Sequence, residues 1–234
     1  MEYKSFAYQN MTFNSPLSED RAAVLVERCS PVGKILDLGC GWGELLLRAL
    51  AANPDAKGIG VDTDLSLVDR GEKAAADRGL QNRVEFICKD ATAITDRFDL
   101  VIALGVTHIW GNDAQAIESV QKLLKPAGKL LYGAGIWIKT PSAELLEIFG
   151  ELPTFDELQN LIQSNGFEII YSDVATTEEW DAFESSWRRG LEESGDAELI
   201  AFAAERKREY EEGYRGMLGF GYMVLKNLDS YIGD

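Results

Sequence analysis

The stretch that decides the fold reads Ile35-Leu36-Asp37-Leu38-Gly39-Cys40-Gly41-Trp42-Gly43. A short β-type run that contains an acid passes directly into a glycine-rich turn, and a helix candidate over residues 43–52 follows the turn. Glycines allow a backbone to turn tightly and to come close to a ligand. The start of a helix also presents backbone N–H groups that have no partner within the helix. The stretch therefore predicts a strand, a turn and a helix that together form a ligand site.

Further strand and helix candidates alternate along the chain after this turn. Runs typical of strands occupy residues 34–38, 58–62, 84–88, 98–104 and 129–134. Helix candidates cover residues 43–52, 65–78 and 113–125, with stops at Gly79 and at the turn over residues 126–128. Such alternation predicts parallel βαβ units with helices on both faces of the sheet. We therefore expect an α/β fold with a Rossmann-like, doubly wound sheet.

The segments that flank this core carry their own start and stop signals. Ser15-Pro16 is expected to open a lead-in helix before the core. After the core, the expected elements are a capped helix over residues 154–165, a strand over 167–171, a capped helical region over 176–215 with a break near 194–195, and a last strand over 218–225. The last strand is expected to be antiparallel, in a hairpin at the edge of a mostly parallel sheet.

This order of elements predicts a single domain, as does a length of 234 residues. Its parts are lead-in helices over residues 1–32, a cofactor-binding core over 33–175, a helical lid insertion over 176–216, and the last strand and tail over 217–234.

The excess of acidic residues restricts the kinds of binding partner that we expect. The chain has 23 Lys and Arg against 39 Asp and Glu, a formal charge of −16. Nucleic acids and anionic membranes are therefore poor partners, because both require clustered positive charge. No apolar run is long enough to span a membrane, and the first residues do not form a signal peptide. The cysteines Cys29, Cys40 and Cys88 are few and far apart, which favours a reduced, cytoplasmic protein.

The spacing of acids and glycines distinguishes between two kinds of ligand, a dinucleotide and a nucleoside without phosphates. Asp62 follows Gly43 by 19 residues, where an acid can accept hydrogen bonds from a ribose. A dinucleotide site places glycine where this chain has Glu44, and a buried Glu beside a pyrophosphate would repel it. The expected ligand instead lacks phosphates and carries positive charge. S-adenosylmethionine meets these requirements, since it has a ribose, an amino acid and a sulfonium.

The motif at residues 37–43 resembles the first motif of class I S-adenosylmethionine-dependent methyltransferases. The likeness continues through Gly60-Val61-Asp62-Thr63-Asp64, Cys88-Lys89-Asp90-Ala91, Phe98-Asp99-Leu100-Val101, Leu123-Leu124-Lys125-Pro126-Ala127-Gly128 and Asn165-Gly166-Phe167. Its ordered motifs cover roughly residues 15–175. The resemblance implies a methyltransferase that uses S-adenosylmethionine and releases S-adenosylhomocysteine.

The resemblance also implies residue roles. It places the turn with Gly39, Cys40 and Gly41 around the methionine moiety, Asp37 near the amino group of that moiety, Asp62 on the ribose, Thr63, Asp90 and Ala91 at the adenine, and Leu104 and Gly105 beside the transferring methyl group. Other interpretations remain open. Asp37 could cap the turn, Asp62 could be a helix N-cap, and Asp90 could be an ordinary loop residue. Cys40 is more readily a small packing residue than a nucleophile.

The segment after residue 104 lacks the motifs of several classes of methyltransferase, and this restricts the kinds of methyl acceptor that we expect. Leu104-Gly105-Val106-Thr107 stands where enzymes that methylate base amines resemble one another in an Asp/Asn-Pro-Pro-aromatic motif. There is also no nearby cysteine nucleophile and no acidic cluster for a metal, so no metal is expected. The remaining branch methylates an O or N nucleophile of a small molecule by in-line displacement. His108, the single histidine, is a candidate general base; the alternative is a structural histidine.

Aromatic residues are concentrated in the variable parts of the chain. Trp110, Trp137, Trp180 and Tyr214 are candidate substrate-binding residues, although an aromatic stripe could equally anchor the lid. Residues 175–234 hold 14 acidic and 7 basic residues, which hints at a cationic acceptor. Two alternatives to the enzyme are a non-catalytic S-adenosylmethionine-binding module and an NAD-dependent oxidoreductase. The sequence indicates neither the acceptor nor the oligomeric state.

Overall fold

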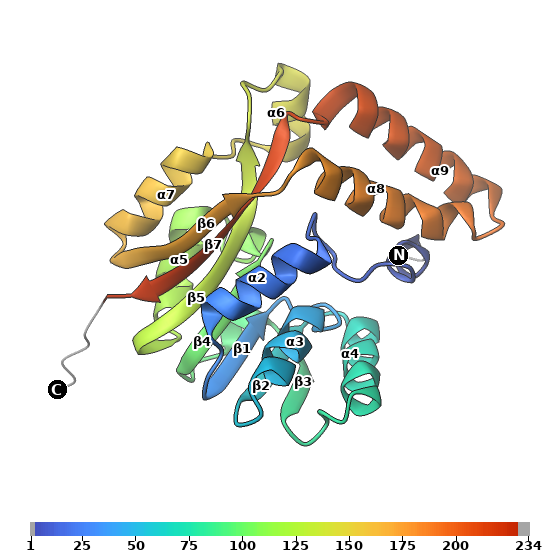
Figure 1. Ribbon diagram of the computed structural model, residues 1–234. Coiled ribbons are helices and arrows are strands. Elements are labelled where there is room, and N and C mark those ends of the chain that lie inside the picture. Colours follow the sequence, from blue (N-terminus) through green and yellow to red (C-terminus); the bar gives the residue numbers. More distant parts are fainter. Residues whose placement is uncertain (1–2, 229–234) are drawn as a thin grey trace. The chain divides into compact units, whose positions relative to one another are not determined.

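The computed structural model describes residues 3–228, in which helices and strands alternate (Figure 1). The strands are β1 (Lys34–Leu38), β2 (Lys57–Asp62), β3 (Val84–Cys88), β4 (Phe98–Leu104), β5 (Leu124–Trp137), β6 (Phe167–Val174) and β7 (Leu218–Asn227). The α-helices are α1 (Tyr3–Tyr8), α2 (Glu19–Cys29), α3 (Glu44–Ala52), α4 (Leu65–Asp77), α5 (Asp113–Gln121), α6 (Ala143–Phe149), α7 (Phe155–Ser164), α8 (Thr177–Glu192) and α9 (Ala197–Arg208). Short helical turns are η1 (Ala91–Ala93), η2 (Thr107–Ile109) and the π-helix η3 (Glu209–Tyr214).

The strands form one sheet in the order β3-β2-β1-β4-β5-β7-β6. The pairs β1–β2, β1–β4, β2–β3 and β4–β5 are parallel. The last strand is antiparallel: the N–H of Ala175 bonds to Phe220, whereas the N–H of Leu228 bonds to Gly166, so the partner number falls as β7 advances. The predicted fold class, a mostly parallel Rossmann-like sheet with an antiparallel last strand, is confirmed.

The topology places the carboxyl ends of β1 and β4 at a switch point. From β1 the chain winds outward to β2 and β3, and it then returns to β4 and winds the other way to β5. Right-handed crossovers in opposite directions place α3 and α4 on one face of the sheet and α5 on the other. At such a switch point the loops separate, and ligands bind outside the carboxyl ends of the strands.

Two compact units make up the structure. The sheet unit comprises Asp20–Ala134, Asp156–Asp173 and the described part of Gly221–Asp234. The helical unit comprises the described part of Met1–Glu19, Gly135–Phe155 and Val174–Phe220. We predicted from the sequence that all parts of the chain form a single domain, and this stays a prediction. No helix within residues 3–228 is both long enough and apolar enough to cross a membrane.

The core of the sheet unit explains why its strands read as apolar runs. Ile35, Leu36 and Leu38 of β1 are fully buried, because helices cover both faces of a parallel sheet. Leu46 of α3 packs on β2 at Gly58, where an added Cβ would lie 2.7 Å from Leu46 Cδ1. Each fully buried side chain of this kind contributes about 1.5–3 kcal/mol. This packing holds the glycine-rich turn between β1 and α3 in place.

Most predicted elements occur within a few residues of their expected bounds, and three predictions need correction. The helix expected over residues 113–125 ends at Gln121, and β5 begins at Leu124, so the predicted turn lies within the strand as a bulge with Ala127 at φ 58°. The helix expected from Ser15-Pro16 begins only at Glu19, because a tight turn closes from Leu17 N–H to Ser15 O. Finally, the helical region after residue 176 ends in a π-helix.

The helical unit is built on the hairpin of α8 and α9. The Tyr3 ring of α1 lies 6.1 Å from Trp187 and 5.5 Å from Phe202, so α1 packs on both helices of the hairpin. Gly190 is required there, because an added Cβ would lie 1.8 Å from the Phe6 carbonyl oxygen. A second group of buried aromatic and aliphatic residues includes Trp137, Leu145, Tyr210, Tyr214 and Leu218.

Candidate active site

The glycine-rich turn adopts a backbone that only glycine accommodates easily. Gly39, Gly41 and Gly43 have φ of 59°, 56° and 66°, all in the left-handed region. An added Cβ at Gly39 would lie 2.5 Å from Val106 Cγ1, so the turn packs directly on the loop after β4. An added Cβ at Gly41 would meet no atom within 4 Å. The backbone at Gly41 therefore faces open space at the switch point, where a ligand can approach it.

Phe86 supports this turn, a role that the sequence does not predict. Added Cβ atoms at Gly43, Gly60 and Gly71 would each lie 2.3–2.8 Å from an atom of the Phe86 ring. Glycines from the turn, from β2 and from α4 thus make room for one aromatic side chain of β3. The signal in the sequence is weak, because a buried Phe in a strand usually denotes ordinary core packing.

Asp62 joins the end of β2 to the turn. Its Oδ2 accepts a hydrogen bond from the Gly41 backbone N–H at 2.8 Å, and its Oδ1 accepts one from the Asp64 N–H at 2.9 Å. The interpretation of Asp62 as a helix N-cap is wrong, because Asp64 caps α4 through Ser66. Asp62 is half-buried. Each carboxylate oxygen has a second lone pair, so the side chain can still accept hydrogen bonds from a ligand.

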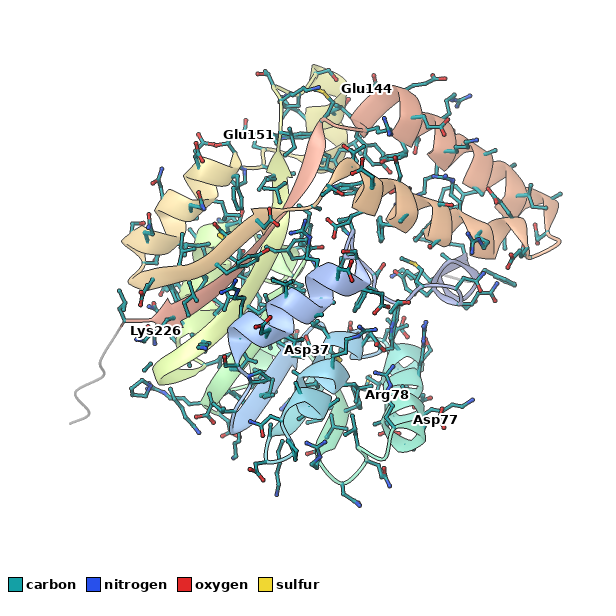
Figure 2. The ribbon with its side chains drawn as sticks, in the orientation of Figure 1. Asp37, Asp77, Arg78, Glu144, Glu151 and Lys226 are labelled. Atoms are coloured by element: carbon teal, nitrogen blue, oxygen red, sulfur yellow. The ribbon has the colours of Figure 1, made fainter. Side chains whose placement is uncertain are left out.

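Asp37 is the most unusual carboxylate of the site (Figure 2). It is 5% exposed, and no group within residues 3–228 donates a hydrogen bond to it. Burial raises its pKa well above the ordinary value, and the nearby charge of Asp62 raises it further. An unpaired buried carboxylate is costly and calls for a partner. The alternative in which Asp37 caps the turn therefore has no hydrogen bond to support it.

Cys40 behaves as a packing residue in this structure. Its Sγ lies beside Gly60, where an added Cβ would come within 3.0 Å, and its thiol donates to the Gly41 carbonyl at 3.4 Å. Burial, together with the charges of Asp37 and Asp62, raises the pKa of the thiol. The thiol therefore stays protonated at neutral pH, which disfavours a nucleophilic role.

The residues expected at the adenine lie after β2 and β3. Asp90 is exposed and caps η1: its Oδ1 accepts from the backbone N–H and the hydroxyl of Thr92, both at 2.8 Å. These hydrogen bonds lower the pKa of Asp90. Ala91 is buried and Thr63 is exposed. Capping explains why an Asp stands at position 90 without excluding a ligand on the same carboxylate.

The loop after β4 holds the candidate base. Leu104 ends the strand, the Gly105 N–H bonds to the Gly133 carbonyl at 2.8 Å, and His108 lies exposed within η2. Next to His108, the Thr107 hydroxyl donates to Asp113 Oδ1 at 3.0 Å. The buried Tyr132 hydroxyl donates to the same oxygen at 2.6 Å. This anchoring through Asp113 and Tyr132 was not foreseen.

The structure brings the predicted site residues together in two sets. Asp37, Gly39, Cys40, Gly41, Asp62, Thr63, Asp90, Ala91, Leu104, Gly105, His108 and Trp110 belong to the sheet unit, at or after the carboxyl ends of β1 to β4. Trp137, Trp180 and Tyr214 belong to the helical unit, where they share one aromatic cluster and the rings of Trp180 and Tyr214 are 6.4 Å apart.

Glu44 was expected to repel a pyrophosphate as an unpaired buried carboxylate, but in the structure it forms ion pairs. It is 9% exposed, and its Oε1 accepts from Arg48 Nε at 2.8 Å. Its Oε2 accepts from Arg78 Nη2 at 2.5 Å; Figure 2 labels Arg78 beyond the end of α4. Because two arginines balance its charge, repulsion by Glu44 is not the ground for preferring a phosphate-free ligand. The preference rests on Asp37 and Asp62 instead.

The site fits S-adenosylmethionine on its own chemistry. The buried carboxylate of Asp37 lacks a donor, and the amino acid part of the cofactor carries an ammonium group. The Gly41 backbone faces open space, and Asp62 offers acceptors at the adjacent strand end. These features lie at the switch point, where the fold places ligands.

Comparisons with known proteins agree with this chemistry. Residues 35–128 match the family described as methyltransferase domain. The chain is 31% identical to the uncharacterized protein YjhP of Escherichia coli over 91% of its own length and 92% of the relative's. It is 30% identical to the ubiquinone/menaquinone biosynthesis C-methyltransferase UbiE of Shewanella frigidimarina over 60% of its own length, and it spans 57% of that relative.

Solved structures share the whole fold. A crystal structure of YjhP from E. coli has a TM-score of 0.84 at 25% identity, covering 96% of this chain and 99% of that one. A methyltransferase from Geobacter sulfurreducens, crystallised with S-adenosyl-L-homocysteine, has a TM-score of 0.88 at 22% identity, covering 96% and 97%. The chain belongs to the S-adenosylmethionine-dependent methyltransferases with the class I fold. A methyltransferase from Thiobacillus denitrificans, also crystallised with S-adenosyl-L-homocysteine, has a TM-score of 0.86 at 21% identity, covering 96% of this chain and 98% of that one.

Proposed function

We propose that this methyltransferase acts on a small molecule and transfers the methyl group to an O or N nucleophile of that molecule. The observation that carries the proposal is the segment after β4, where Leu104-Gly105-Val106-Thr107 leads directly to an exposed His108 on an anchored turn. Such a segment offers a base for an acceptor proton and lacks the motifs of nucleic acid methylation. The net charge of −16 supports the same exclusion.

The geometry at the ends of β1 to β4 supports the cofactor-binding roles that we propose. When bound, S-adenosylmethionine supplies an electrophilic methyl group on a sulfonium. Asp37 pairs with the ammonium group of the methionine moiety, and the Gly39–Gly41 backbone lies along that moiety. Asp62 accepts from the ribose hydroxyls while it holds the turn through Gly41. Thr63, Asp90 and Ala91 border the adenine.

The acceptor roles belong to the turn after β4. Methyl transfer is an in-line displacement, so the protein must above all align the acceptor atom with the methyl group. Leu104 and Gly105 lie beside the path from the acceptor atom to the methyl group. His108 accepts the proton that the acceptor oxygen or nitrogen loses, and the Thr107–Asp113–Tyr132 contacts keep its turn in place. Trp110, Trp137, Trp180 and Tyr214 bind the body of the acceptor.

The three cysteines are consistent with a reducing compartment. Cys29, Cys40 and Cys88 are all free thiols in the structure. This agrees with the proposal that the protein works in the cytoplasm.

A screen with methyl-labelled S-adenosylmethionine tests the proposed function. The cofactor is incubated with the protein and with a cell extract that has been divided by size. We expect label in the small-molecule fraction and loss of that label with the His108→Ala variant. Label that enters only nucleic acid or protein would contradict the proposal.

A further inference from the structure

Asp37 lies near the carboxyl end of β1, at the switch point of the sheet (Figure 2). Its neighbours in the sheet are Gly60 of β2 on one side and Ile102 of β4 on the other. Glycine has no side chain and the side chain of isoleucine has no polar atom, so neither neighbour offers a side-chain donor. The Asp37 side chain is buried, and its carboxyl group receives no hydrogen bond from any residue in the range 3–228.

The charges around Asp37 oppose its ionisation. Burial raises the pKa of the Asp37 carboxyl well above its usual range, and the negative charge of Asp62 raises it further. The thiol of Cys40 supplies no positive charge, and its own pKa is raised by burial and by the same two carboxylates. Within the described part of the chain, no cation acts electrostatically on Asp37.

The other charged groups around the glycine-rich turn interact elsewhere or lie exposed. Arg48 and Arg78 form ion pairs with Glu44, and the charge of Glu44 also acts on Arg70. His108 is exposed in η2, on the loop after β4 that packs against the turn. These groups therefore leave the Asp37 carboxyl without a counter-ion.

Such surroundings favour the protonated carboxyl group. A buried carboxylate without a counter-ion is costly, and the group avoids this cost by keeping its proton. A bound ammonium group reverses the balance, because it brings a positive charge and N–H donors to the carboxyl group and offsets the charge of Asp62. The protonation state of Asp37 should therefore depend on whether an ammonium group is bound.

We propose that Asp37 keeps its proton in the ligand-free protein and releases it to the solvent when the ammonium group of S-adenosylmethionine or S-adenosylhomocysteine binds. The O–H bond of the carboxyl group breaks, its electron pair stays on the carboxylate, and water or buffer takes the proton. The ammonium group keeps its own protons and pairs with the carboxylate. This inference rests on the proposed contact between Asp37 and the ammonium group, and it adds that cofactor binding is linked to the release of a proton.

The linkage gives the affinity for the cofactor a defined dependence on pH. Below the folded pKa of Asp37, a proton must leave before the ion pair forms, so the affinity should fall about tenfold for each unit by which the pH is lowered. Above that pKa the carboxyl group is already ionised, and the affinity should be constant. The range from pH 5.5 to 7.5 suits the measurement, because α-amino groups lose their proton only at about 7.7–8.0.

Calorimetry with S-adenosylhomocysteine counts the released protons. Titrations at each pH in two buffers with different heats of ionisation give the number of protons released from the difference between the measured heats. For wild type we expect a release that approaches about one proton per ligand at pH 5.5, and an affinity that rises with pH from that value. Release of no proton at pH 5.5, or an affinity that stays the same from pH 5.5 to 7.5, overturns the proposal.

Variants identify the group that loses the proton. Asp37→Asn should release no proton, and its affinity should not depend on pH. Asp90→Asn is the matched control, because Asp90 is an exposed carboxylate of the same site that accepts two hydrogen bonds from Thr92. This control, Cys40→Ala and His108→Ala should each release as many protons as wild type. Equal release by Asp37→Asn and wild type overturns the proposal, as does loss of the release in Cys40→Ala or His108→Ala.

A second ligand tests the part played by the ammonium group without any variant. 5′-Methylthioadenosine has the nucleoside and the thioether of S-adenosylhomocysteine but lacks its amino acid part. Its binding should therefore release no proton. Equal release with both ligands would assign the proton to a group that responds to the nucleoside, and it would overturn the proposal.

The outcomes separate this inference from the contact on which it rests. If wild type releases no proton and Asp37→Asn weakens S-adenosylhomocysteine equally at pH 5.5 and 7.5, Asp37 binds the ammonium group as a permanent carboxylate; the contact then stands and the linkage is wrong. If Asp37→Asn changes neither the affinity at pH 7.5 nor the proton release, the contact and the linkage both fail. Methyl transfer to a small molecule is decided separately by the extract screen.

Discussion

The Gly41 backbone N–H donates a hydrogen bond to Asp62 Oδ2 at 2.8 Å, so the residue proposed to bind the ribose also fixes the glycine-rich turn. The other oxygen of the same carboxylate holds the Asp64 N–H, at the start of α4. One side chain thus links the end of β2 to the loop after β1. The same contact orients the open face of Gly41 and leaves lone pairs for a ligand.

Asp62→Ala should therefore impair both folding and binding. It leaves two backbone N–H groups without their acceptor, which costs about 1–3 kcal/mol of unfolding free energy. It also removes the proposed ribose contact, so the affinity for S-adenosylhomocysteine should fall at least about tenfold. Denaturant unfolding and calorimetry measure the two effects. Unchanged affinity would show that Asp62 serves the turn alone.

Gly39→Ala and Gly41→Ala should differ in stability although both glycines have positive φ. Each alanine pays the left-handed backbone penalty of roughly 1–2 kcal/mol. The Gly39 change adds a clash, because its Cβ would lie 2.5 Å from Val106 Cγ1, whereas the Gly41 position is open. Denaturant unfolding should rank Gly39→Ala as less stable. Adding Val106→Ala should recover part of the loss at Gly39 and none at Gly41, and equal effects in both backgrounds would contradict the packing argument.

Asp37→Asn should stabilise the ligand-free protein at neutral pH. The folded pKa of Asp37 is raised above its unfolded value by burial and by Asp62. Below the pKa of the unfolded chain, the side chain is protonated in both states and costs no stability. As the pH rises from that value through the folded pKa, the unfolded chain ionises more readily, so the free energy of unfolding falls. The neutral amide of asparagine avoids this loss, so the free energy of unfolding at pH 7 should be about 1–3 kcal/mol higher than in wild type.

Two further measurements complete the Asp37 test. The difference in unfolding free energy between Asp37→Asn and wild type should shrink as the pH falls to about 4 and below, because Asp37 is then protonated in the unfolded chain as well as in the folded protein. The variant should also bind S-adenosylhomocysteine more weakly, since it lacks the charge that faces the ammonium group. A variant that is less stable at pH 7 and binds normally would contradict both roles.

His108→Ala should reduce turnover about 100-fold or more, since a general base contributes roughly 100- to 10,000-fold. The affinity for S-adenosylhomocysteine should not change. Tyr132→Phe removes one of the two hydroxyls that hold Asp113, so turnover should fall only a few-fold. Steady-state assays on a methyl acceptor found in the screen measure these effects. Near-wild-type turnover by His108→Ala at saturating acceptor would make the residue structural.

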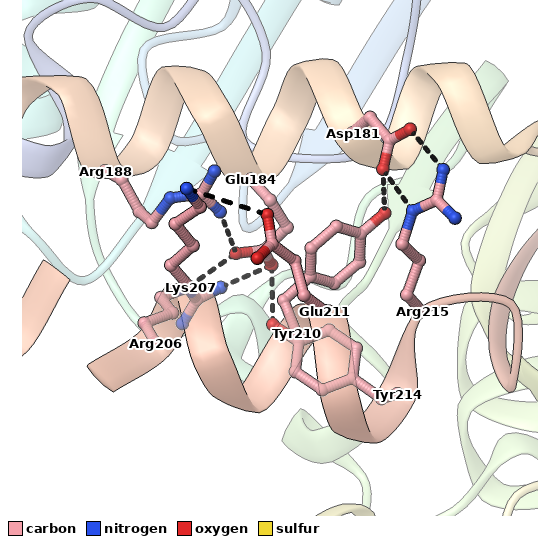
Figure 3. Close-up of polar contacts among 9 residues, drawn as sticks. All are labelled: Asp181, Glu184, Arg188, Arg206, Lys207, Tyr210, Glu211, Tyr214 and Arg215. Carbon is pink, nitrogen blue, oxygen red and sulfur yellow. Dashed lines mark hydrogen bonds and ion pairs between the residues drawn. The ribbon is translucent and has the colours of Figure 1, made fainter. Parts of the chain in front are cut away.

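Glu184→Gln should destabilise the protein, because it removes the charge of a fully buried carboxylate that accepts two hydrogen bonds from the half-buried Arg206 (Figure 3). Breaking a buried pair in this way costs about 3–5 kcal/mol. Glu205→Gln is the control, since Glu205 is exposed and its pair with Arg208 is 3.9 Å long. Its effect should stay within about 0.5 kcal/mol. Thermal unfolding compares the two variants.

The sequence predicted the parts of the fold that depend on local signals. Alternating strands and helices, the glycine-rich turn and the capping box at Thr176 appear as expected, and Glu179 completes that capping box. The ends of elements were harder to predict where tertiary packing decides them. The helix before β5 stops at Gln121 because the chain enters the sheet early and forms a bulge at Ala127.

The candidate site was predictable only where a residue stands in a motif. Asp37, Gly41 and Asp62 could be named because their spacing along the chain reflects adjacent strand ends. Phe86 could not, because its role arises from contacts with glycines of three elements that are distant in sequence. Sequence alone also overstated the effect of Glu44, whose charge Arg48 and Arg78 balance.

The most direct test of the central claim is transfer of a labelled methyl group from S-adenosylmethionine into the small-molecule fraction of a cell extract. We predict label in at least one small molecule, reduced label with Asp62→Ala, and near-complete loss of label with His108→Ala. Absence of label from that fraction, while the protein binds S-adenosylhomocysteine normally, would contradict the claim that its acceptor is a small molecule.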